Sequence, residues 1–240
     1  MTDMGYYFYG GSGYVLVILA ALLSIIAQAK VNSTYKKYSS KLTGRNLTAE
    51  QAARSILDAN GLTNVRIESV SGRLTDHYDP RANVIRLSDS VRTSTSVAAV
   101  GVAAHEAGHA VQHAVGYVPI KVRNAIVPVA NIGSVAGPYL IMIGLLLSGM
   151  GLVSDVFVNA GIWFFSAAVL FQIVTLPVEF NASNRAIKIL SEGMYLESDE
   201  VPAVKKVLGA AAMTYVAAAA VSVANLLRFI MIAGGRRRDD

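Results

Sequence analysis

Three of the four histidines in this 240-residue chain lie four residues apart, in the segment AAHEAGHAVQHA (residues 103–114). The first two, His105 and His109, enclose Glu106 in an H-E-x-x-H sequence. On an α-helix, residues four apart are separated by about 40° around the axis and about 6 Å along it, so two imidazoles can bind one Zn²⁺ ion. A carboxylate beside them can accept a proton from metal-bound water and deliver it to a leaving amine. The pattern predicts a hydrolytic zinc site with Glu106 as general base.

The third histidine, His113, is a poor candidate for the same ion. It would lie about 80° around and about 12 Å along the helix from His105. One zinc ion reaches three such residues only where the helix breaks, as at the glycine of H-E-x-x-H-x-x-G-x-x-H sites. Only Ala, Val and Gln separate His109 from His113 here. We therefore expect His113 near the helix end. The alternative for the whole motif, a metal-free network of buried histidines, leaves unpaired buried charge, which is costly.

A zinc site of this kind needs a third ligand, a carboxylate or a histidine from another element. Glu179 lies at the inner end of an apolar stretch, in LPVEFNASNRA, where a charge needs a partner. Three other acidic residues belong to a solvated helix or strand: Glu50, Asp58 and Glu68. We predict Glu179 as the third ligand, at the start of a helix that leaves the membrane. The alternative is an ordinary carboxylate stabilised by the dipole of that helix N-terminus.

The elements that must position these residues include membrane spans. The chain is 53% hydrophobic and 15% charged, with a mean hydropathy of +0.46, whereas about a quarter of the residues in a soluble domain are charged. Three apolar segments are about long enough to cross a bilayer, which takes roughly 17–25 residues. They are residues 14–29, 125–152 and 156–178. A fourth segment, residues 207–233, either crosses the membrane or packs along the others, and we favour a crossing.

The distribution of charge predicts the topology. Five basic residues follow the first span between residues 30 and 45, and the loop between the second and third spans has none. The positive-inside rule therefore places the N-terminus outside and residues 30–120 in the cytoplasm. The net charge of +5 is concentrated beside apolar segments. It indicates contact with the lipid bilayer and not with nucleic acid.

Residues 31–120 are the soluble-looking part of the chain. NLTAEQAARSILDANGL predicts an amphipathic helix with a capping box of Thr48 and Gln51. NVRIESV and ANVIRLS predict a β-hairpin or small sheet, and a helix between Ser96 and Gly116 carries the H-E-x-x-H sequence.

The expected fold is therefore mainly α, a polytopic helical membrane protein with a small α+β cytoplasmic insertion and an H-E-x-x-H active-site helix. We expect five segments: 1–30 (N-terminal tail and first span), 31–120 (cytoplasmic region), 121–178 (second and third spans), 179–206 (cytoplasmic helix with the third ligand) and 207–240 (C-terminal apolar helix and basic tail).

YDPRANVIRLS, AAHEAGHAVQHA and LPVEFNASNRA together resemble the YugP-type family of bacterial membrane zinc metallopeptidases, over about residues 6–237. The resemblance implies a multi-pass protease of the bacterial inner membrane whose active site faces the cytoplasm. It also implies protein or peptide substrates, His105 and His109 as zinc ligands, and Glu106 as general base. EFNAS is more distantly similar to the E-x-x-A-D stretch of HtpX-type and CAAX-processing membrane metallopeptidases, whose Glu is the third zinc ligand. Ser183 replaces the Asp of that stretch and can hydrogen-bond a ligand histidine, but it supplies no charge.

Peptide hydrolysis also needs a donor for the developing oxyanion. The candidates are Arg185, His77 and Tyr78, which have simpler roles as a phosphate-facing basic residue and as residues of a hairpin turn. If NVIRLS is an edge strand over the site, it could bind the substrate backbone by strand addition.

Two other classes of function are alternatives. The first is a zinc-binding membrane assembly factor or chaperone-like protein without proteolytic activity, although purely structural zinc has no use for Glu106. The second is a transporter, which would need partnered charges inside its membrane spans. Gly133, Gly137 and Pro138 interrupt the second span, and we interpret them as packing positions and a kink.

Overall fold

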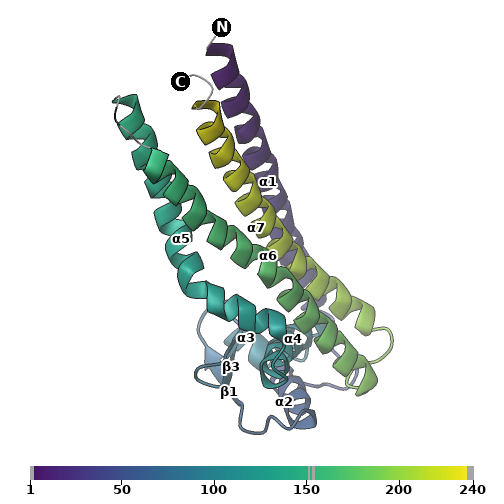
Figure 1. Cartoon of the computed structure of the whole chain (residues 1–240). Helices are drawn as coiled ribbons and strands as arrows, with labels where there is room; N and C mark the ends of the chain where they lie inside the picture. Colours follow the sequence, from purple (N-terminus) through teal and green to yellow (C-terminus); the bar gives the residue numbers. More distant parts are fainter. Residues whose placement is uncertain (1–2, 151, 153–154, 237–240) are drawn as a thin grey trace. The chain divides into compact units, whose positions relative to one another are not determined.

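The computed structural model describes residues 3–150, 152 and 155–236. Within these residues the chain is mainly helical, as expected, and four of its helices are long. The last four residues of the basic tail, and residues 151 and 153–154 of the loop after the second span, lie outside the described residues. The elements are α1 Asp3–Tyr38, α2 Ala49–Ala59, β1 Arg66–Val70, β2 His77–Asp79, β3 Val84–Ser88, α3 Asp89–Arg92, α4 Val97–Ala114, α5 Val118–Gly149, α6 Asp155–Glu192 and α7 Val201–Arg236 (Figure 1).

The chain divides into two compact units built from interleaved segments. The membrane unit comprises residues 1–26, 122–176 and 214–240. The site unit comprises residues 27–121 and 177–213. All residues predicted to do chemistry belong to the site unit, so that their geometry can be described within one compact body.

Four helices of the described chain are long and apolar enough to cross a membrane: α1, α5, α6 and α7. The segment after residue 200, whose crossing was the least certain from sequence, is one continuous helix, α7, with an apolar stretch over Val201–Gly234. Arg228 interrupts this stretch, and its guanidinium carbon lies 4.6 Å from the centre of the Tyr14 ring. Such a cation–π contact stabilises a charge that has left water.

Small residues let α5 and α6 approach each other in the membrane unit. A Cβ atom on Gly161 would stand 2.6 Å from the carbonyl oxygen of Gly137, which is closer than real Cβ contacts allow. Pro138 lies inside α5 without ending it, as prolines do in spans whose freed backbone groups find other partners. The interpretation of Gly137 as a packing position is therefore confirmed.

The helix predicted to begin at Glu179 does not begin there. Instead α6 continues without interruption from Asp155 to Glu192, with Pro177 inside it (Figure 1). A proline removes only one backbone donor, and apolar helices tolerate the loss where neighbouring groups compensate. The apolar stretch before Pro177 and the segment that carries Glu179 are therefore one helix.

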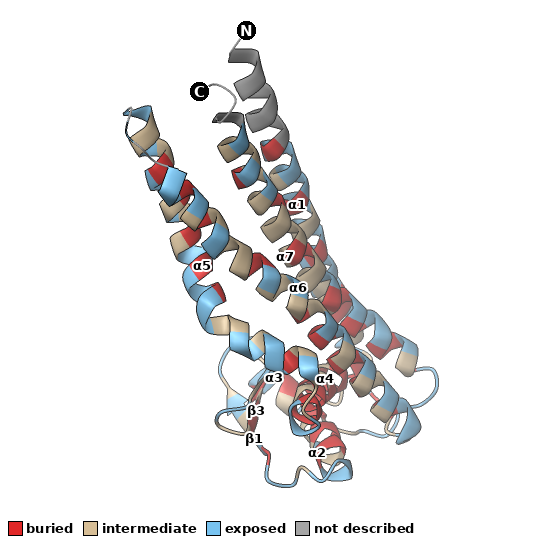
Figure 2. Cartoon of the chain, in the orientation of Figure 1, coloured by how far each residue is buried: buried red, intermediate tan, exposed pale blue. Residues whose placement is uncertain are grey.

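Two shorter helices of the site unit begin where the sequence predicts. Thr48 accepts a hydrogen bond from the Gln51 amide (3.2 Å), and the Gln51 side chain accepts one from the Thr48 amide (3.0 Å), which completes the capping box of α2. The Ser96 hydroxyl caps α4 by accepting the Ala99 amide at 3.2 Å. The apolar faces of α2 and α4 form the core of the site unit (Figure 2).

Of the two predicted forms, a β-hairpin or a small sheet, the structure has the small sheet. Its strand order is β1-β3-β2, with β1 parallel to β3 and β2 antiparallel to it. NVRIESV and ANVIRLS are therefore not the two arms of a hairpin, because the segment between them, which looked like a turn, contains β2. Since β3 lies in the middle, NVIRLS has no free edge, and the free edges belong to β1 and β2.

Candidate metal centre

Helices α4 and α6 bring three of the predicted site residues together. The Nε2 atom of His105 lies 3.2 Å from Oε2 of Glu179, and the Nε2 atom of His109 lies 3.4 Å from the same oxygen. The two Nε2 atoms are 3.1 Å apart. Each residue therefore offers one ligand atom to a single point, whereas His113 is not part of this group.

These separations suit a tetrahedral zinc ion. Zinc binds imidazole nitrogen and carboxylate oxygen at about 2.0–2.2 Å, which places neighbouring ligand atoms about 3.3–3.6 Å apart in a tetrahedron. The three observed distances, 3.1, 3.2 and 3.4 Å, lie at or just below this range. Three protein ligands leave a fourth position open, which distinguishes catalytic zinc sites from closed structural ones.

Glu179 is buried, with 4% of its surface exposed. It lies well inside α6, which begins at Asp155, so the alternative reading as a carboxylate at a helix N-terminus is wrong. Burial acts to lower the pKa of His109, but the hydrogen bond to Glu179 and the charge of Glu106 outweigh it and raise that pKa. A buried carboxylate between two imidazoles thus attracts positive charge, as a cation site must.

Gly108, which directly precedes His109, allows α6 to approach α4. A Cβ atom at Gly108 would stand 2.7 Å from the carbonyl oxygen of Ala182. Ala182 is fully buried and lies three residues after Glu179. The close approach at Gly108 therefore brings the Glu179 turn of α6 within reach of the histidines. This role of Gly108 was not predicted from the sequence, although the glycine lies inside the motif.

A buried serine on α6 contacts the first histidine from the side opposite the metal position. The Ser183 hydroxyl lies 3.1 Å from Nδ1 of His105. A hydroxyl that accepts the Nδ1 proton leaves the Nε2 lone pair free for a metal ion. The predicted hydrogen bond between Ser183 and a ligand histidine is therefore present.

A buried glutamine contacts the second histidine. Gln112 has no exposed surface, and its Oε1 atom lies 3.0 Å from Nδ1 of His109. Its amide nitrogen donates to the Val178 carbonyl oxygen (2.8 Å) and to Oδ1 of Asn181 (2.9 Å). Gln112 thus orients His109 and connects α4 to the backbone of α6 next to Glu179. This role of Gln112 was not predicted from the sequence, although an amide side chain three residues after His109 in an apolar helix was a usable signal.

Glu106 is buried as well, with 8% of its surface exposed, and it contacts the edge of the sheet. Its Oε2 atom accepts a hydrogen bond of 3.0 Å from the backbone amide of Tyr78, in β2. Because this amide points to α4, the free edge of β2 faces the H-E-x-x-H helix. The strand beside the site is therefore β2, and not the NVIRLS segment that the sequence suggested.

Two candidate oxyanion donors are held by other side chains. Arg185 donates from Nε to Oδ1 of Asn181 at 2.8 Å, so it belongs to the same polar group as Gln112. The Tyr78 hydroxyl donates to Oδ1 of Asn83 at 3.2 Å. Burial, with a smaller contribution from Asp79, raises the pKa of Tyr78, which keeps this hydroxyl protonated.

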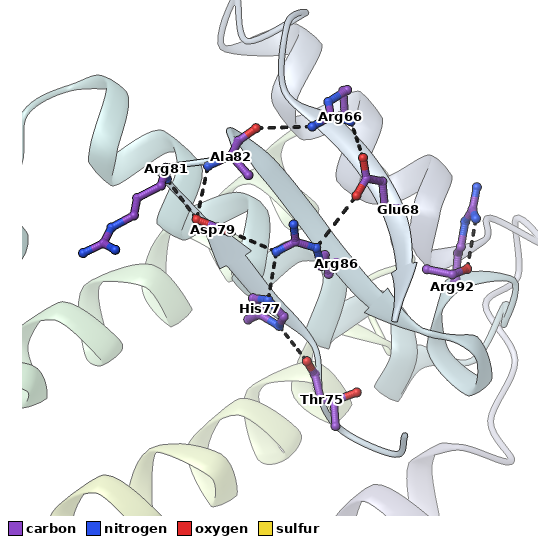
Figure 3. Close-up of polar contacts among 10 residues, drawn as sticks. Arg66, Glu68, Thr75, His77, Asp79, Arg81, Ala82, Arg86 and Arg92 are labelled. Carbon is purple, nitrogen blue, oxygen red and sulfur yellow. Dashed lines mark hydrogen bonds and ion pairs between the residues drawn. The ribbon is translucent and has the colours of Figure 1, made fainter. Parts of the chain in front are cut away.

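The third candidate, His77, belongs to a polar cluster on the sheet (Figure 3). Its Nδ1 atom lies 2.8 Å from the Thr75 carbonyl oxygen, and its Nε2 atom lies 3.4 Å from Arg86. Arg86 also binds Asp79 at 3.0 Å, which lowers the pKa of that carboxyl, and approaches Glu68 at 3.8 Å. His77 is thus engaged with the backbone at Thr75 and with Arg86, a half-buried residue of β3.

Comparisons with known proteins identify the family to which the chain belongs. A family model described as "Putative neutral zinc metallopeptidase" matches residues 13–234. The "Putative membrane protease YugP" of Bacillus subtilis (strain 168) is 48% identical over 220 residues, which cover 91% of this chain and 96% of that protein. No solved structure matches the chain. The matched region includes every residue of the metal centre.

Proposed function

Since the chain belongs to this family of zinc metallopeptidases, we propose that it hydrolyses peptide bonds at a zinc ion held by His105, His109 and Glu179. The observation that carries the proposal is the triangle of ligand atoms with sides of 3.1, 3.2 and 3.4 Å. When bound there, zinc supplies a Lewis acid that lowers the pKa of a water molecule and polarises the substrate carbonyl.

Glu106 is the proposed general base. Its carboxylate accepts a proton from the attacking water and then donates it to the nitrogen of the leaving amine, which balances the reaction. One carboxylate oxygen is held by the Tyr78 amide, and this hydrogen bond restricts the carboxylate to one orientation. Ser183 and Gln112 hold the imidazoles of His105 and His109 in the tautomer that presents Nε2 to the metal.

The free edge of β2 is the proposed binding site for the substrate backbone. Tyr78 directs its amide away from β3 and toward Glu106, and the carbonyl of the same residue in a strand points to the same side. Since the Tyr78 amide already donates to Glu106, an extended segment of a protein or peptide that adds beside β2 would donate to the Tyr78 carbonyl oxygen. Tyr78 would then connect substrate position with the orientation of the base.

The charge pattern and the four apolar helices support a proposal for the cellular location. We place the chain in a bacterial cell membrane as a multi-pass protein with the site unit in the cytoplasm. The chain has no cysteine, so a single Ser71→Cys substitution on the exposed surface of the site unit can report sidedness. A membrane-impermeant maleimide should label this variant only after the cells are permeabilised.

The alternative is a zinc protein of membrane assembly that cleaves nothing. A base beside an open metal position favours hydrolysis over this alternative, because structural zinc sites are closed by four protein ligands.

The deciding experiment compares the wild type with Glu106→Gln for zinc content and for cleavage of unfolded casein in detergent. Glu106→Gln should keep its zinc and lose about 100-fold or more of the activity, the usual contribution of a general base. Glu192→Gln, an exposed carboxylate of α6 away from the ligands, is the matched control and should cleave normally. Unchanged cleavage by Glu106→Gln would exclude the proposed mechanism. A wild type that binds zinc tightly and cleaves no unfolded protein or peptide would favour the assembly factor.

A further inference from the structure

The site unit contains a pocket that has no role in the proposed peptide hydrolysis. It has a volume of about 510 Å³ and lies between the end of α1 and the beginning of α7. The lining residues of α1 have the spacing i, i+4, i+7, i+8, and those of α7 have the spacing i, i+3, i+4, i+7, so each set lies on one face of its helix. The lining residues are Lys30, Thr34, Lys37 and Tyr38 of α1 and Lys206, Gly209, Ala210 and Met213 of α7.

The charge of this pocket is positive and uncompensated. Three lysines line it, and no acidic residue does. None of the three lysines forms an ion pair with any residue that the structure describes. Like charges around one cavity repel each other, and a bound anion would remove that repulsion. By contrast, Lys188, in a neighbouring pocket between α6 and α7, has Glu192 at 4.0 Å.

The remaining lining offers a hydroxyl and an apolar wall. Thr34 is buried, and its hydroxyl makes no hydrogen bond within the described part of the chain. Ala210 and Met213 are apolar, and Met213 is exposed. The pocket therefore combines donors for an oxyanion with a surface for a hydrocarbon chain.

We propose that this pocket binds the phosphate headgroup of an anionic phospholipid, with the three lysines around the phosphate and the acyl chains along Ala210 and Met213. Both walls belong to helices that are long and apolar enough to cross a membrane. Basic pockets between such helices bind anionic headgroups, and lysine binds phosphate as a mobile point charge. This site is separate from the proposed peptidase chemistry and does not depend on it.

The test measures lipid binding to the purified full-length protein in neutral detergent by native mass spectrometry. The probes are phosphatidylglycerol, phosphatidylcholine and inorganic phosphate. The pocket variant Lys30→Gln/Lys37→Gln/Lys206→Gln is compared with Lys36→Gln/Lys121→Gln/Lys205→Gln, which removes the same charge from lysines outside the pocket. The wild type should bind phosphatidylglycerol in preference to the other two probes. The pocket variant should lose about tenfold or more in affinity for phosphatidylglycerol, since each lysine near an anionic surface contributes about fivefold.

A second variant keeps all three lysines. Gly209 lines this pocket and the neighbouring one between α6 and α7, and a Cβ atom there meets nothing within 4 Å. Gly209→Phe should therefore fold, narrow the space beside the three lysines and reduce phosphatidylglycerol binding. If the pocket variant does not fold, unchanged phosphatidylglycerol binding by Gly209→Phe would overturn the proposal. Equal losses in the two triple variants would overturn the proposal, because the binding would then reflect diffuse charge. Inorganic phosphate binding as tightly as the lipid would overturn the assignment to a phospholipid.

Discussion

The two histidines of the H-E-x-x-H sequence are chemically alike, but different groups hold them. His105 has a single hydroxyl, that of Ser183, on its Nδ1 atom. His109 has the amide of Gln112, which also binds two groups of α6, at Val178 and Asn181. Ser183 extends from α6 to a histidine of α4, and Gln112 extends from α4 to the backbone of α6. The candidate metal centre therefore lies at the contact between α4 and α6, and more hydrogen bonds connect the two helices on the His109 side than on the His105 side.

The largest expected effect is the loss of the α6 ligand. Glu179→Ala removes one of three proposed ligands, so zinc affinity should fall by more than the 10–100-fold typical of residues that only support a ligand. Competition with a fluorescent zinc chelator measures this affinity, and Glu192→Gln is the control. If Glu179→Ala binds zinc as the wild type does, both histidines must find their third ligand elsewhere.

Gln112→Leu should produce the next largest effect, because it frees His109 and also disconnects α4 from α6. Zinc affinity should fall about 10–100-fold, and the thermal stability of the metal-free protein should fall as well, since buried groups lose their partners. The variant Gln112→Glu keeps an acceptor for His109 but loses the donor to Val178. If Gln112→Glu restores zinc affinity but not stability, the two roles of Gln112 are separate, as the structure predicts.

Gly108→Ala tests whether the contact between α4 and α6 depends on the close approach of their backbones. The added Cβ atom would stand 2.7 Å from the Ala182 carbonyl oxygen, so we expect a loss of about 1–3 kcal/mol in the free energy of unfolding, typical of overpacking. The same change at Gly209, where a Cβ atom meets nothing, should stabilise α7 by up to about 1 kcal/mol. Equal effects at both glycines, measured by thermal unfolding, would contradict the proposed close approach.

Ser183→Ala should have the smallest effect of the series. It removes one hydrogen bond from His105 and leaves the Gln112 contacts intact, so zinc affinity should fall by about tenfold or less, at the low end for such partners. The same chelator competition measures this change. If Ser183→Ala lost more zinc affinity than Gln112→Leu, the inference that more of the support lies on the His109 side would be wrong.

The sequence predicted those parts of the molecule that depend on local chemistry. His105, Glu106 and His109 share one helix, so their spacing alone brings them together, and the capping box of Thr48 and Gln51 is equally local. Glu179 could be found because a charge at the end of an apolar stretch needs a partner. Four long helices were visible as apolar segments, although a helix start was wrongly predicted at Glu179, inside α6.

The features that the sequence did not reveal depend on contacts between distant segments. The parallel pairing of β1 with β3 depends on contacts between segments that are distant in sequence. A strand of only three residues, such as β2, resembles a turn in the sequence. The amide of Gln112 looks like any polar residue of a helix until α6 is packed against it. The backbone hydrogen bond from Tyr78 to Glu106 leaves no trace in residue types at all.

Zinc X-ray absorption spectroscopy of the purified protein tests whether α4 and α6 bind one metal ion together. The scattering from imidazole rings counts the histidine ligands, and the first shell gives the metal–ligand distances. The structure predicts two imidazoles and about two oxygen ligands at about 2.0–2.2 Å, with one oxygen lost or replaced in Glu179→Ala. A third imidazole would make His113 or His77 a ligand, and a spectrum unchanged by Glu179→Ala would remove α6 from the metal centre. Either result would contradict a zinc site formed by His105, His109 and Glu179.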